Sequence, residues 1–323
     1  MTGGTGFVGA HVVRKLLERG DDVIALVRLT SDLTLLDSLP VKKVTGDIRD
    51  PDSFMDCLEG VEELYHVAAD YRLWSRHPID LYKNNAGGTK NVLEAARIKG
   101  VGKIVYTSTV GCLGLPRDGG SGDESTPVTR EDMIGHYKRS KFDAEQFALQ
   151  YASDGLDVVI VNPSTPVGPG DIKPTPTGRI IVDFLRGRMP AYVDTGLNLV
   201  AVEDVAEGHL LATEKGLRGE KYILGNENIT LRELLAILSE ITHKKTPVVR
   251  IPHWVAYTAA AASEAAARLR GCQPGISIES VRMSRNKMFF SPLKAVERLG
   301  LPQSSVEDAL DRAVQWFRDK GFA

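Results

Sequence analysis

The chain has 323 residues, of which 42% are hydrophobic and 25% charged, and its formal net charge is −2. This length suits one large or two modest domains, and the composition is that of an ordinary globular protein. The nearly balanced charge offers no basic surplus for nucleic acid and no acidic tail for a charged partner. No apolar run reaches the roughly 20 residues of a membrane-spanning helix, so no integral membrane segment is expected.

Cysteine and histidine are sparse and show no metal-binding pattern. The three cysteines, Cys57, Cys112 and Cys272, are an odd number and include no CxxC spacing. They support neither a disulfide framework nor a zinc cluster, and we interpret them as reduced thiols of a cytoplasmic protein. The seven histidines form no HExxH or HxH pattern, so no metal site is expected.

The first half of the chain alternates short β-branched runs with amphipathic segments. The amphipathic segments, such as 11–19 and 89–99, carry apolar residues at steps of three and four, which indicates helices. The β-branched runs are continuously apolar, which suits parallel strands that are covered on both faces. This alternation predicts an α/β fold with a doubly wound parallel sheet of the Rossmann type. The expected strands are 23–27, 41–44, 63–67, 103–107 and 157–161.

Beyond residue 161 the pattern changes. Residues 162–178 are rich in Pro, Gly and Thr and are expected to form one long functional loop, with a helix over 180–186. The apolar stretch 254–267 predicts a buried or amphipathic helix. Two later helices are marked by their first residues, the capping box Thr230–Glu233 and the pair Ser305 and Asp308.

Two domains are expected. Residues 1–163 would form a dinucleotide-binding domain, and residues 164–323 mainly a smaller, mostly helical substrate lobe with some segments returning to the first domain. The sequence contains no internal repeat that would favour a solenoid.

Glycines recur at positions 3, 6 and 9 in the segment TGGTGFVG. One glycine would permit a tight turn, one would let the backbone approach a pyrophosphate, and one would let the next helix pack closely on the sheet. That helix would point its N-terminal amides at the phosphates. A glycine triplet alone is weak evidence, the alternative being a flexible N-terminus. Only Met1 precedes the motif, so we expect a truncated or misassigned start and a sheet without its first strand.

Tyr137 and Lys141 are spaced i and i+4 and would share one face of a helix. A tyrosine pKa near 10 is too high for ready proton exchange at neutral pH. A neighbouring ammonium, together with a nicotinamide cation, would stabilise the phenolate and lower that pKa. The alternative is a solvated ion-rich helix face. A hydroxyl at the end of the preceding strand, within 107–109, would complete the catalytic set.

These motifs, in this order, resemble the extended short-chain dehydrogenase/reductases, the NAD-dependent epimerase/dehydratase family. The resemblance covers nearly the whole chain. Aligning Gly114 with the family pattern selects Thr109 as the catalytic hydroxyl, with Ser108 as the alternative, and implies that Lys141 also holds the nicotinamide ribose. The cofactor contacts that the resemblance and the glycine motif imply are Gly3, Thr5, Gly6, Phe7, Val8, Gly9, Asp47, Ile48, Val67, Ala68, Ala69, Asn85, Thr107, Tyr137, Lys141, Asn162, Pro163 and Ser164.

The choice of dinucleotide depends on Arg28. NAD-binding proteins of this kind place Asp or Glu about 20 residues beyond the glycine loop, to hold the ribose hydroxyls. Arg28 stands there instead and could pair bidentately with a 2′-phosphate, which favours NADP. The alternative is a surface Arg28, with NAD held by Asp32 or Asp47.

A small-molecule substrate pocket is expected beside the cofactor. Asp70, Tyr71 and Trp74 follow the cofactor-lining segment and Arg179 would lie opposite, a mixture that suits a polar, ring-bearing substrate. Long strings such as AADYRLW (68–74) resemble bacterial hopanoid-associated sugar epimerases, which are also described as dihydroflavonol 4-reductase-like.

Three functions follow from this resemblance. The first is epimerisation of a sugar or hopanoid-linked sugar, and the second is NADPH-dependent reduction of a carbonyl compound. The third is a non-catalytic dinucleotide-binding module, which the retention of Tyr137 and Lys141 disfavours. The resemblance also implies a homodimer through 85–99 and 137–151.

Overall fold

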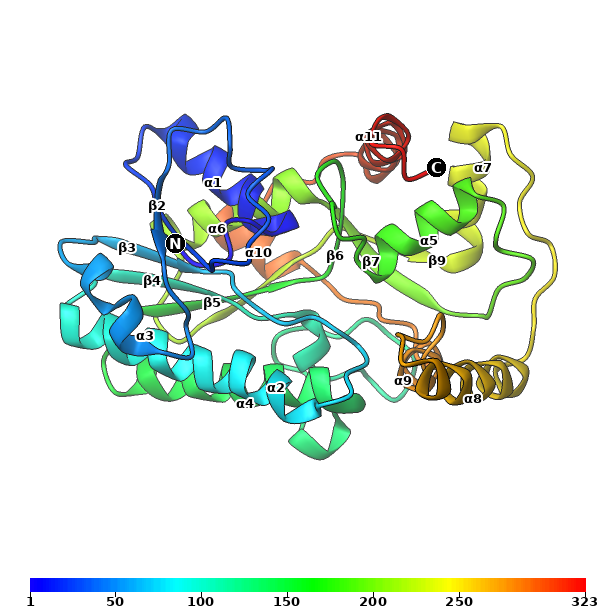
Figure 1. Cartoon of the computed structure of the whole chain (residues 1–323), viewed down its shortest axis with the longest axis horizontal. Coiled ribbons are helices and arrows are strands. Elements are labelled where there is room, and N and C mark those ends of the chain that lie inside the picture. Colours follow the sequence, from blue (N-terminus) through cyan, green and yellow to red (C-terminus); the bar gives the residue numbers. More distant parts are fainter.

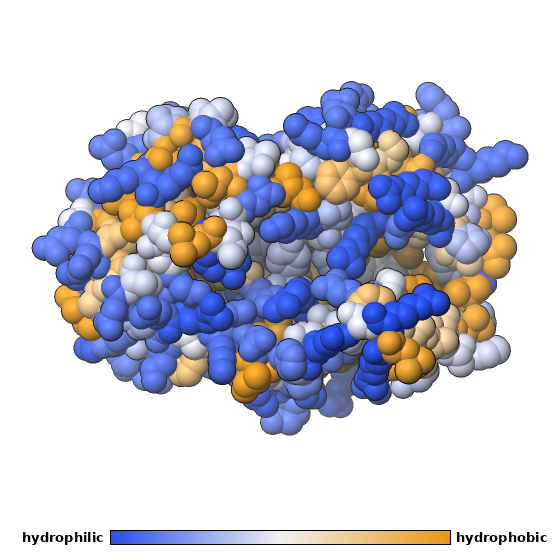
Figure 2. All heavy atoms as spheres, viewed as in Figure 1, coloured by the Kyte–Doolittle hydropathy of each residue, from blue (hydrophilic) through white to orange (hydrophobic).

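The computed structural model describes residues 1–323 and shows two layered bodies side by side, with a hollow between them (Figures 1 and 2). The strands are β1 (Ile24–Val27), β2 (Lys42–Thr45), β3 (Glu63–His66), β4 (Lys103–Thr107), β5 (Val158–Pro163), β6 (Thr165–Val167), β7 (Gly196–Ala201), β8 (Lys221–Leu224) and β9 (Glu227–Thr230). The helices are α1 (Phe7–Arg19), α2 (Pro78–Tyr82), α3 (Gly88–Lys99), α4 (Gly135–Ser153), α5 (Pro176–Leu185), α6 (Val202–Lys215), α7 (Leu231–Thr242), α8 (His253–Arg270), α9 (Ile278–Met283), α10 (Leu293–Leu299) and α11 (Val306–Asp319).

The first body is built on a parallel sheet with helices on both faces, as the alternation of segments predicts. Strands β3, β4, β5 and β8 lie in that order and pair in parallel, and β1 pairs in parallel with β2. All five strands expected in the first half are present, within one or two residues of their expected ends. The Rossmann-type fold is therefore confirmed.

The position between β1 and β3 is held by the first two residues of the chain. Thr2 bridges in parallel to Leu26 of β1 and to His66 of β3. The Leu26 amide donates to the Met1 carbonyl at 2.9 Å, and the Thr2 amide donates to the Tyr65 carbonyl at 2.9 Å. Met1 and Thr2 thus occupy the position between β1 and β3 that was expected to be vacant, and these bonds join the β1–β2 pair to the other strands.

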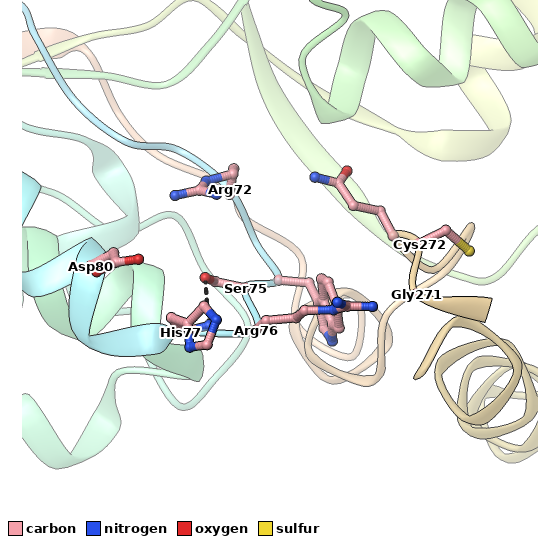
Figure 3. A pocket seen from close by; sticks show the side chains of 9 residues that line it. Arg72, Ser75, Arg76, His77, Asp80, Gly271 and Cys272 are labelled. Atoms are coloured by element: carbon pink, nitrogen blue, oxygen red, sulfur yellow. Dashed lines mark hydrogen bonds between the residues drawn. The ribbon is translucent and has the colours of Figure 1, made fainter. Parts of the chain in front are cut away.

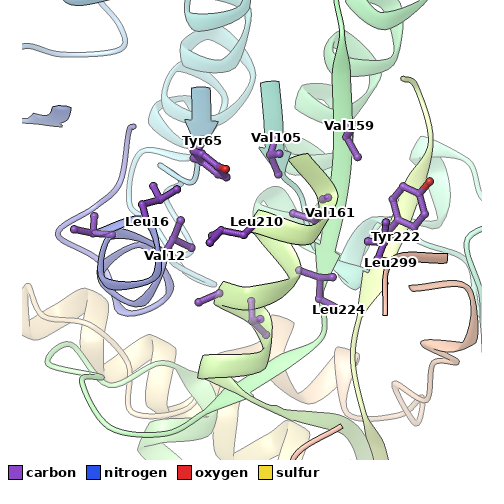
Figure 4. Packing of buried hydrophobic residues seen from close by; sticks show 14 of the residues in the cluster. Val12, Leu16, Tyr65, Val105, Val159, Val161, Leu210, Tyr222, Leu224 and Leu299 are labelled. Carbon is purple, nitrogen blue, oxygen red and sulfur yellow. The ribbon is translucent and has the colours of Figure 1, made fainter. Parts of the chain in front are cut away.

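Two apolar layers cover this sheet. On one face, Val12 and Leu16 of α1 and Leu210 of α6 pack against Val105 of β4 and Val159 of β5 (Figure 4). On the other face, side chains of α3 and α4 pack against the same strands. Each fully buried Val or Leu contributes about 2 kcal/mol of transfer free energy. These layers fix the positions of two helices: α1, which follows the glycine motif, and α4, which carries Tyr137.

The second body is a small sheet of β6, β7 and β9 covered by α5, α7 and α11. Strand β7 pairs in parallel with β6 and antiparallel with β9. The expected capping box is confirmed, because the Thr230 hydroxyl accepts from the Glu233 amide and the Glu233 carboxylate accepts from Thr230. Ser305 caps α11 by accepting from the Asp308 amide. No helix is both long and apolar enough to cross a membrane.

Residues 162–178 do not form one long loop. Asn162 and Pro163 complete β5 and pair with β8, β6 follows after Ser164, and α5 begins at Pro176. Proline is tolerated there because Pro163 is the last residue of its strand and Pro176 is the first of its helix, positions that need no amide donor. Only the middle of the proline-rich segment is loop.

His209 on α6 gives the fold a sensitivity to acid. Its side chain is fully buried, Nδ1 lies 2.7 Å from the Val205 carbonyl and Nε2 lies 2.8 Å from the Thr107 hydroxyl. Since a carbonyl only accepts, Nδ1 carries the proton and Nε2 accepts from Thr107. Burial lowers the pKa of His209 from 6.5 to about 4.

We therefore expect stability to fall as the pH drops below about 6.5, because the unfolded state takes up this proton before the folded state does. The loss between pH 7 and pH 5 should be about 2 kcal/mol. His209→Gln removes this titrating group. The variant should be less stable than the unchanged protein at pH 7, and the difference between their free energies of unfolding should be smaller by about 2 kcal/mol at pH 5. Denaturant unfolding followed by circular dichroism measures this; parallel pH profiles for the two proteins would contradict it.

Candidate active site

The glycine motif forms a tight cradle at the start of α1. Gly3 has φ +74°, and a Cβ there would lie 2.5 Å from the Ala68 amide nitrogen. A Cβ on Gly9 would lie 2.1 Å from the Gly3 carbonyl oxygen. No side chain caps the helix at Gly6, so the amides of its first turn are available to an anion. The segments 1–9 and 67–69, both expected to line the cofactor, are brought together here.

Arg28 directly follows β1 and its side chain is exposed, whereas the alternative ribose-binding acids are engaged elsewhere. The Asp47 carboxylate is paired with Arg49, which holds the pKa of Asp47 below its ordinary value. Asp32 accepts from the amide and hydroxyl of Thr34. Of the three candidates, Arg28 has the side chain that is free to meet a phosphate.

Tyr137 and Lys141 lie on one face of α4, as their spacing predicts. Lys141 is 2% exposed and donates to the Tyr106 hydroxyl at 3.0 Å and to the Thr107 carbonyl at 2.8 Å. Burial lowers the pKa of Lys141 to about 8, so the ammonium is still mostly charged at neutral pH. These two bonds leave one of its three N–H donors for a ligand.

The expected lowering of the Tyr137 pKa is not produced by the chain itself. Burial raises the pKa of Tyr137 well above 10, and the Thr109 hydroxyl acts in the opposite direction. Lys141 donates to Tyr106 and Thr107 rather than to the Tyr137 phenol, and the spacing alone gave no sign of the cost of burying the phenolate. A cationic nicotinamide bound beside the phenol would oppose that cost.

The structure distinguishes the two candidate hydroxyls. Ser108 donates its proton to the Glu145 carboxylate at 2.5 Å. The Thr109 hydroxyl accepts from the Gly111 amide at 3.1 Å, which leaves its own proton free to be donated. Thr109 also lies close enough to Tyr137 to affect its pKa. This arrangement favours Thr109 over Ser108 as the group that meets a substrate oxygen.

Glu145 is a buried residue of the site that the motifs did not predict. Its side chain is 1% exposed. The carboxylate accepts hydrogen bonds from the Ser108 hydroxyl and, at 2.8 Å, from the side-chain amide of Asn162. The signal available in the sequence was its spacing, since it follows Lys141 by four residues on the same helix face. Glu145 therefore ties the ends of β4 and β5 to α4.

The other expected contacts lie at the end of β5 and in the helical segment before α3. The Asn162 Oδ1 and Ser164 Oγ atoms are buried and have no hydrogen-bond partner in the chain, as polar groups awaiting a ligand would be. Asn85, in contrast, is fully engaged: its amide donates to the Asp70 carbonyl and the Ser140 hydroxyl, and its oxygen accepts from the Asp70 amide. It positions the loop that follows the cofactor-lining segment.

The expected substrate residues gather where the two bodies meet. The Tyr71 hydroxyl donates to the Lys173 carbonyl at 3.1 Å, which joins the 70–74 loop to the proline-rich segment. Burial raises the pKa of Tyr71, and the charge of Arg179, exposed on α5, partly opposes that rise. The Asp70 carboxylate pairs with Arg72. Asp70 therefore presents little free charge to a substrate.

A cavity of about 410 Å³ opens beside this loop (Figure 3). Trp74 lines it, as expected, but most of the lining was not predicted. The lining residues that follow Trp74 extend the 70–74 segment, which the sequence analysis had identified. The lining residues that follow α8 lie about 200 positions later in the chain, and no motif marks them as part of a pocket. Arg72 belongs to the 70–74 segment that was expected to form the wall, and the unpredicted lining residues are Ser75, Arg76, His77, Asp80, Gly271, Cys272 and Gln273.

Comparison with known proteins identifies the family. The model of the NAD dependent epimerase/dehydratase family matches residues 1–225. The chain belongs to this family. It is 49% identical, over 100% of its length and 95% of the relative, to a putative dihydroflavonol 4-reductase of Synechocystis sp.. It is also 37% identical to sterol demethylase protein B of Methylococcus capsulatus, with 99% of the chain and 98% of the relative covered.

A solved member of the family has the same architecture. The structure of a nucleoside-diphosphate-sugar epimerase from Pseudomonas aeruginosa superposes with a TM-score of 0.80 at 25% identity, covering 99% of this chain and 97% of that one. Membership makes this chain an NAD(P)-dependent enzyme of the oxidoreductase and epimerase type. The cradle at Gly3 and Gly9 and the unpartnered oxygens at the end of β5 fit such a dinucleotide.

Proposed function

We propose that this enzyme transfers hydride between NADP and a carbinol or carbonyl carbon, and that its net reaction is the reduction of a ketone. The observation that carries the proposal is the placement of the Tyr137 phenol beside the Thr109 hydroxyl, with Lys141 on the same helix face. Bound NADPH supplies the hydride. Tyr137 gives its proton to the substrate oxygen, and Thr109 donates a hydrogen bond to that oxygen and orients it.

The cofactor would be held along the carboxyl edge of the sheet. The amides that begin α1 meet the pyrophosphate, and Arg28 pairs with the 2′-phosphate of the adenosine ribose. The free N–H of Lys141 meets the nicotinamide ribose, and Asn162 and Ser164 border the nicotinamide amide. Arg28, exposed and unpaired with acid, supports NADP over NAD.

Sugar epimerisation is the second candidate function. The cavity beside Trp74 is lined mostly by polar side chains, which would suit a sugar, and the solved relative is named as a nucleoside-diphosphate-sugar epimerase. The two curated relatives carry names that refer to dihydroflavonol and to sterol, which favour a less polar ring system and a net reduction. An epimerase keeps its dinucleotide through the cycle, whereas a reductase exchanges it.

The nucleotide that the purified protein carries separates these functions. We expect protein prepared without added nucleotide to release little NAD on denaturation and to bind NADPH more tightly than NADH. Arg28→Gln should weaken NADPH binding by about 10- to 100-fold and leave NADH binding nearly unchanged, because a charged hydrogen bond to phosphate is lost. Mass spectrometry of the released nucleotide and fluorescence titration measure both effects.

The matched control is Arg97→Gln, an exposed arginine of α3 that pairs with Glu94 far from the glycine motif. It should leave both affinities unchanged. Near-stoichiometric NAD in the purified protein would overturn the reductase assignment in favour of epimerisation. Equal loss of NADH and NADPH affinity in Arg28→Gln would overturn the role of Arg28.

Two further expectations belong to this proposal. A cytoplasmic location is supported by the three cysteines, which are all free thiols. A homodimer through α3 and α4 is also proposed, on the family resemblance alone. Neither enters the mechanism above.

A further inference from the structure

The segment 244–276 carries an unusual concentration of exposed apolar side chains. Val248 is 86% exposed, Trp254 68% and Leu269 91%, and Val249 and Ile276 are also at least half exposed. The segment comprises α8 and its flanking loops, which lie along the lower right edge of the molecule in Figure 1. Orange patches interleaved with blue, hydrophilic side chains lie in the same region of Figure 2. Single exposed apolar residues are common, but a cluster of this kind marks an interaction surface.

Helix α8 buries one apolar face and turns a second apolar face outward. Ala256 and Ala260 are buried against Val281 of α9. At 100° per residue, Trp254 and Leu269 fall together on the opposite side, with the exposed alanines 262 and 265 between them. The outward face therefore has a large apolar side chain at each end and no acidic residue.

The same segment is strongly basic in a chain that is slightly acidic. Residues 244–276 contain five Lys or Arg residues and one acidic residue, Glu264, which gives +4 against −2 for the whole chain. Glu264 is buried, and its carboxylate accepts from the Ile278 amide. Arg268 and Arg270 stand exposed on either side of Leu269. Arg250 pairs with Asp194 at 3.1 Å and Arg268 lies 3.7 Å from Glu264, so the positive charge next to Leu269 that no acid balances is that of Arg270.

The end of α8 adjoins the candidate substrate cavity. Gly271 and Cys272, directly after the helix, line that cavity opposite Arg72 and Arg76 (Figure 3). A partner that binds the outward face of α8 would therefore lie next to the opening of the cavity.

We propose that α8 and its flanking loops dock this enzyme onto the surface of an anionic phospholipid bilayer. An interfacial helix lies in the plane of the membrane with its apolar side chains in the acyl boundary and its basic residues at the headgroups. Trp254 and Leu269 supply the apolar contacts, and Arg268 and Arg270 at the end of α8 supply the charge. The docked enzyme would present its cavity to a substrate carried in the bilayer, whichever of the two proposed reactions it performs.

Vesicle binding tests this inference without any turnover, so its result is independent of the proposed function. The full chain should co-sediment with phosphatidylcholine–phosphatidylglycerol vesicles and only weakly with phosphatidylcholine vesicles. Salt should release it. The double variant Trp254→Gln/Leu269→Gln should bind at least tenfold more weakly. Leu217→Gln, which changes a 66% exposed leucine elsewhere, is the matched control and should bind like the unchanged protein.

A second pair of variants tests the charge. Arg268→Gln/Arg270→Gln should weaken binding to the anionic vesicles by about fivefold for each charge removed. Arg318→Gln/Lys320→Gln, which removes two exposed basic residues at the end of α11, should not. Absence of vesicle binding, or equal binding to both vesicle types, would overturn the proposal. So would a dimer, seen by sedimentation velocity, that Trp254→Gln/Leu269→Gln abolishes, because a second copy would then cover this face.

Discussion

Replacing Tyr137 by Phe should reduce kcat by about 10²- to 10⁴-fold, the range contributed by one positioned acid or base. The substitution removes only the hydroxyl oxygen of a side chain whose ring is already packed against the site, so stability and NADPH affinity should change little. The measurement is the steady-state rate of NADPH oxidation with whichever ketone of a panel the unchanged enzyme reduces, together with a cofactor titration.

The control for this substitution is Tyr151→Phe on the same helix. The Tyr151 hydroxyl donates to Glu94 at 2.9 Å, far along α4 from Thr109. It should lower stability slightly and leave kcat unchanged. Undiminished turnover in Tyr137→Phe would show that another group handles the proton, and the catalytic assignment would be wrong.

Gly9→Ala should abolish measurable cofactor binding and lower the free energy of unfolding by about 2–4 kcal/mol. The added Cβ would lie 2.1 Å from the Gly3 carbonyl oxygen, and both atoms belong to backbone that cannot rotate aside. The turn must open, which moves the amides at the start of α1. Denaturant unfolding and a fluorescence titration with NADPH measure the two effects.

Gly87→Ala is the comparison, because its added Cβ would meet nothing closer than the Tyr82 carbonyl at 3.8 Å. That variant should bind NADPH normally and change stability by less than about 1 kcal/mol. Cofactor binding that survives in Gly9→Ala would mean that the loop does not hold the pyrophosphate.

Local patterns predicted most of the first body. The buried β-branched runs and the i, i+4 pair on α4 are encoded within a few residues, and the structure has them where the sequence placed them. The capping box at Thr230 is likewise a local signal. The proline-rich segment was misjudged because pairing of β5 with β8, which is 60 residues away, overrides the turn preference of proline.

The parts of the site that could not be predicted are those that depend on packing between distant segments. The choice between Ser108 and Thr109 rests on Glu145, whose burial follows from the fit of α4 on the sheet. The raised pKa of Tyr137 has the same origin. The cavity wall after α8 meets Arg72 only because the second body folds back over the first.

The chain passes between the two bodies through very short junctions. One residue, Ser164, separates β5 of the first sheet from β6 of the second, none separates β7 from α6, and two separate β8 from β9. The chain also crosses between α10 and α11, which are joined by the longer segment 300–305. Any opening or closing of the cleft must therefore rotate the backbone sharply at the three short junctions. Because Ser164 also carries an unpartnered buried hydroxyl at the cofactor edge, a closing motion and the seating of the nicotinamide would be mechanically coupled through that one residue.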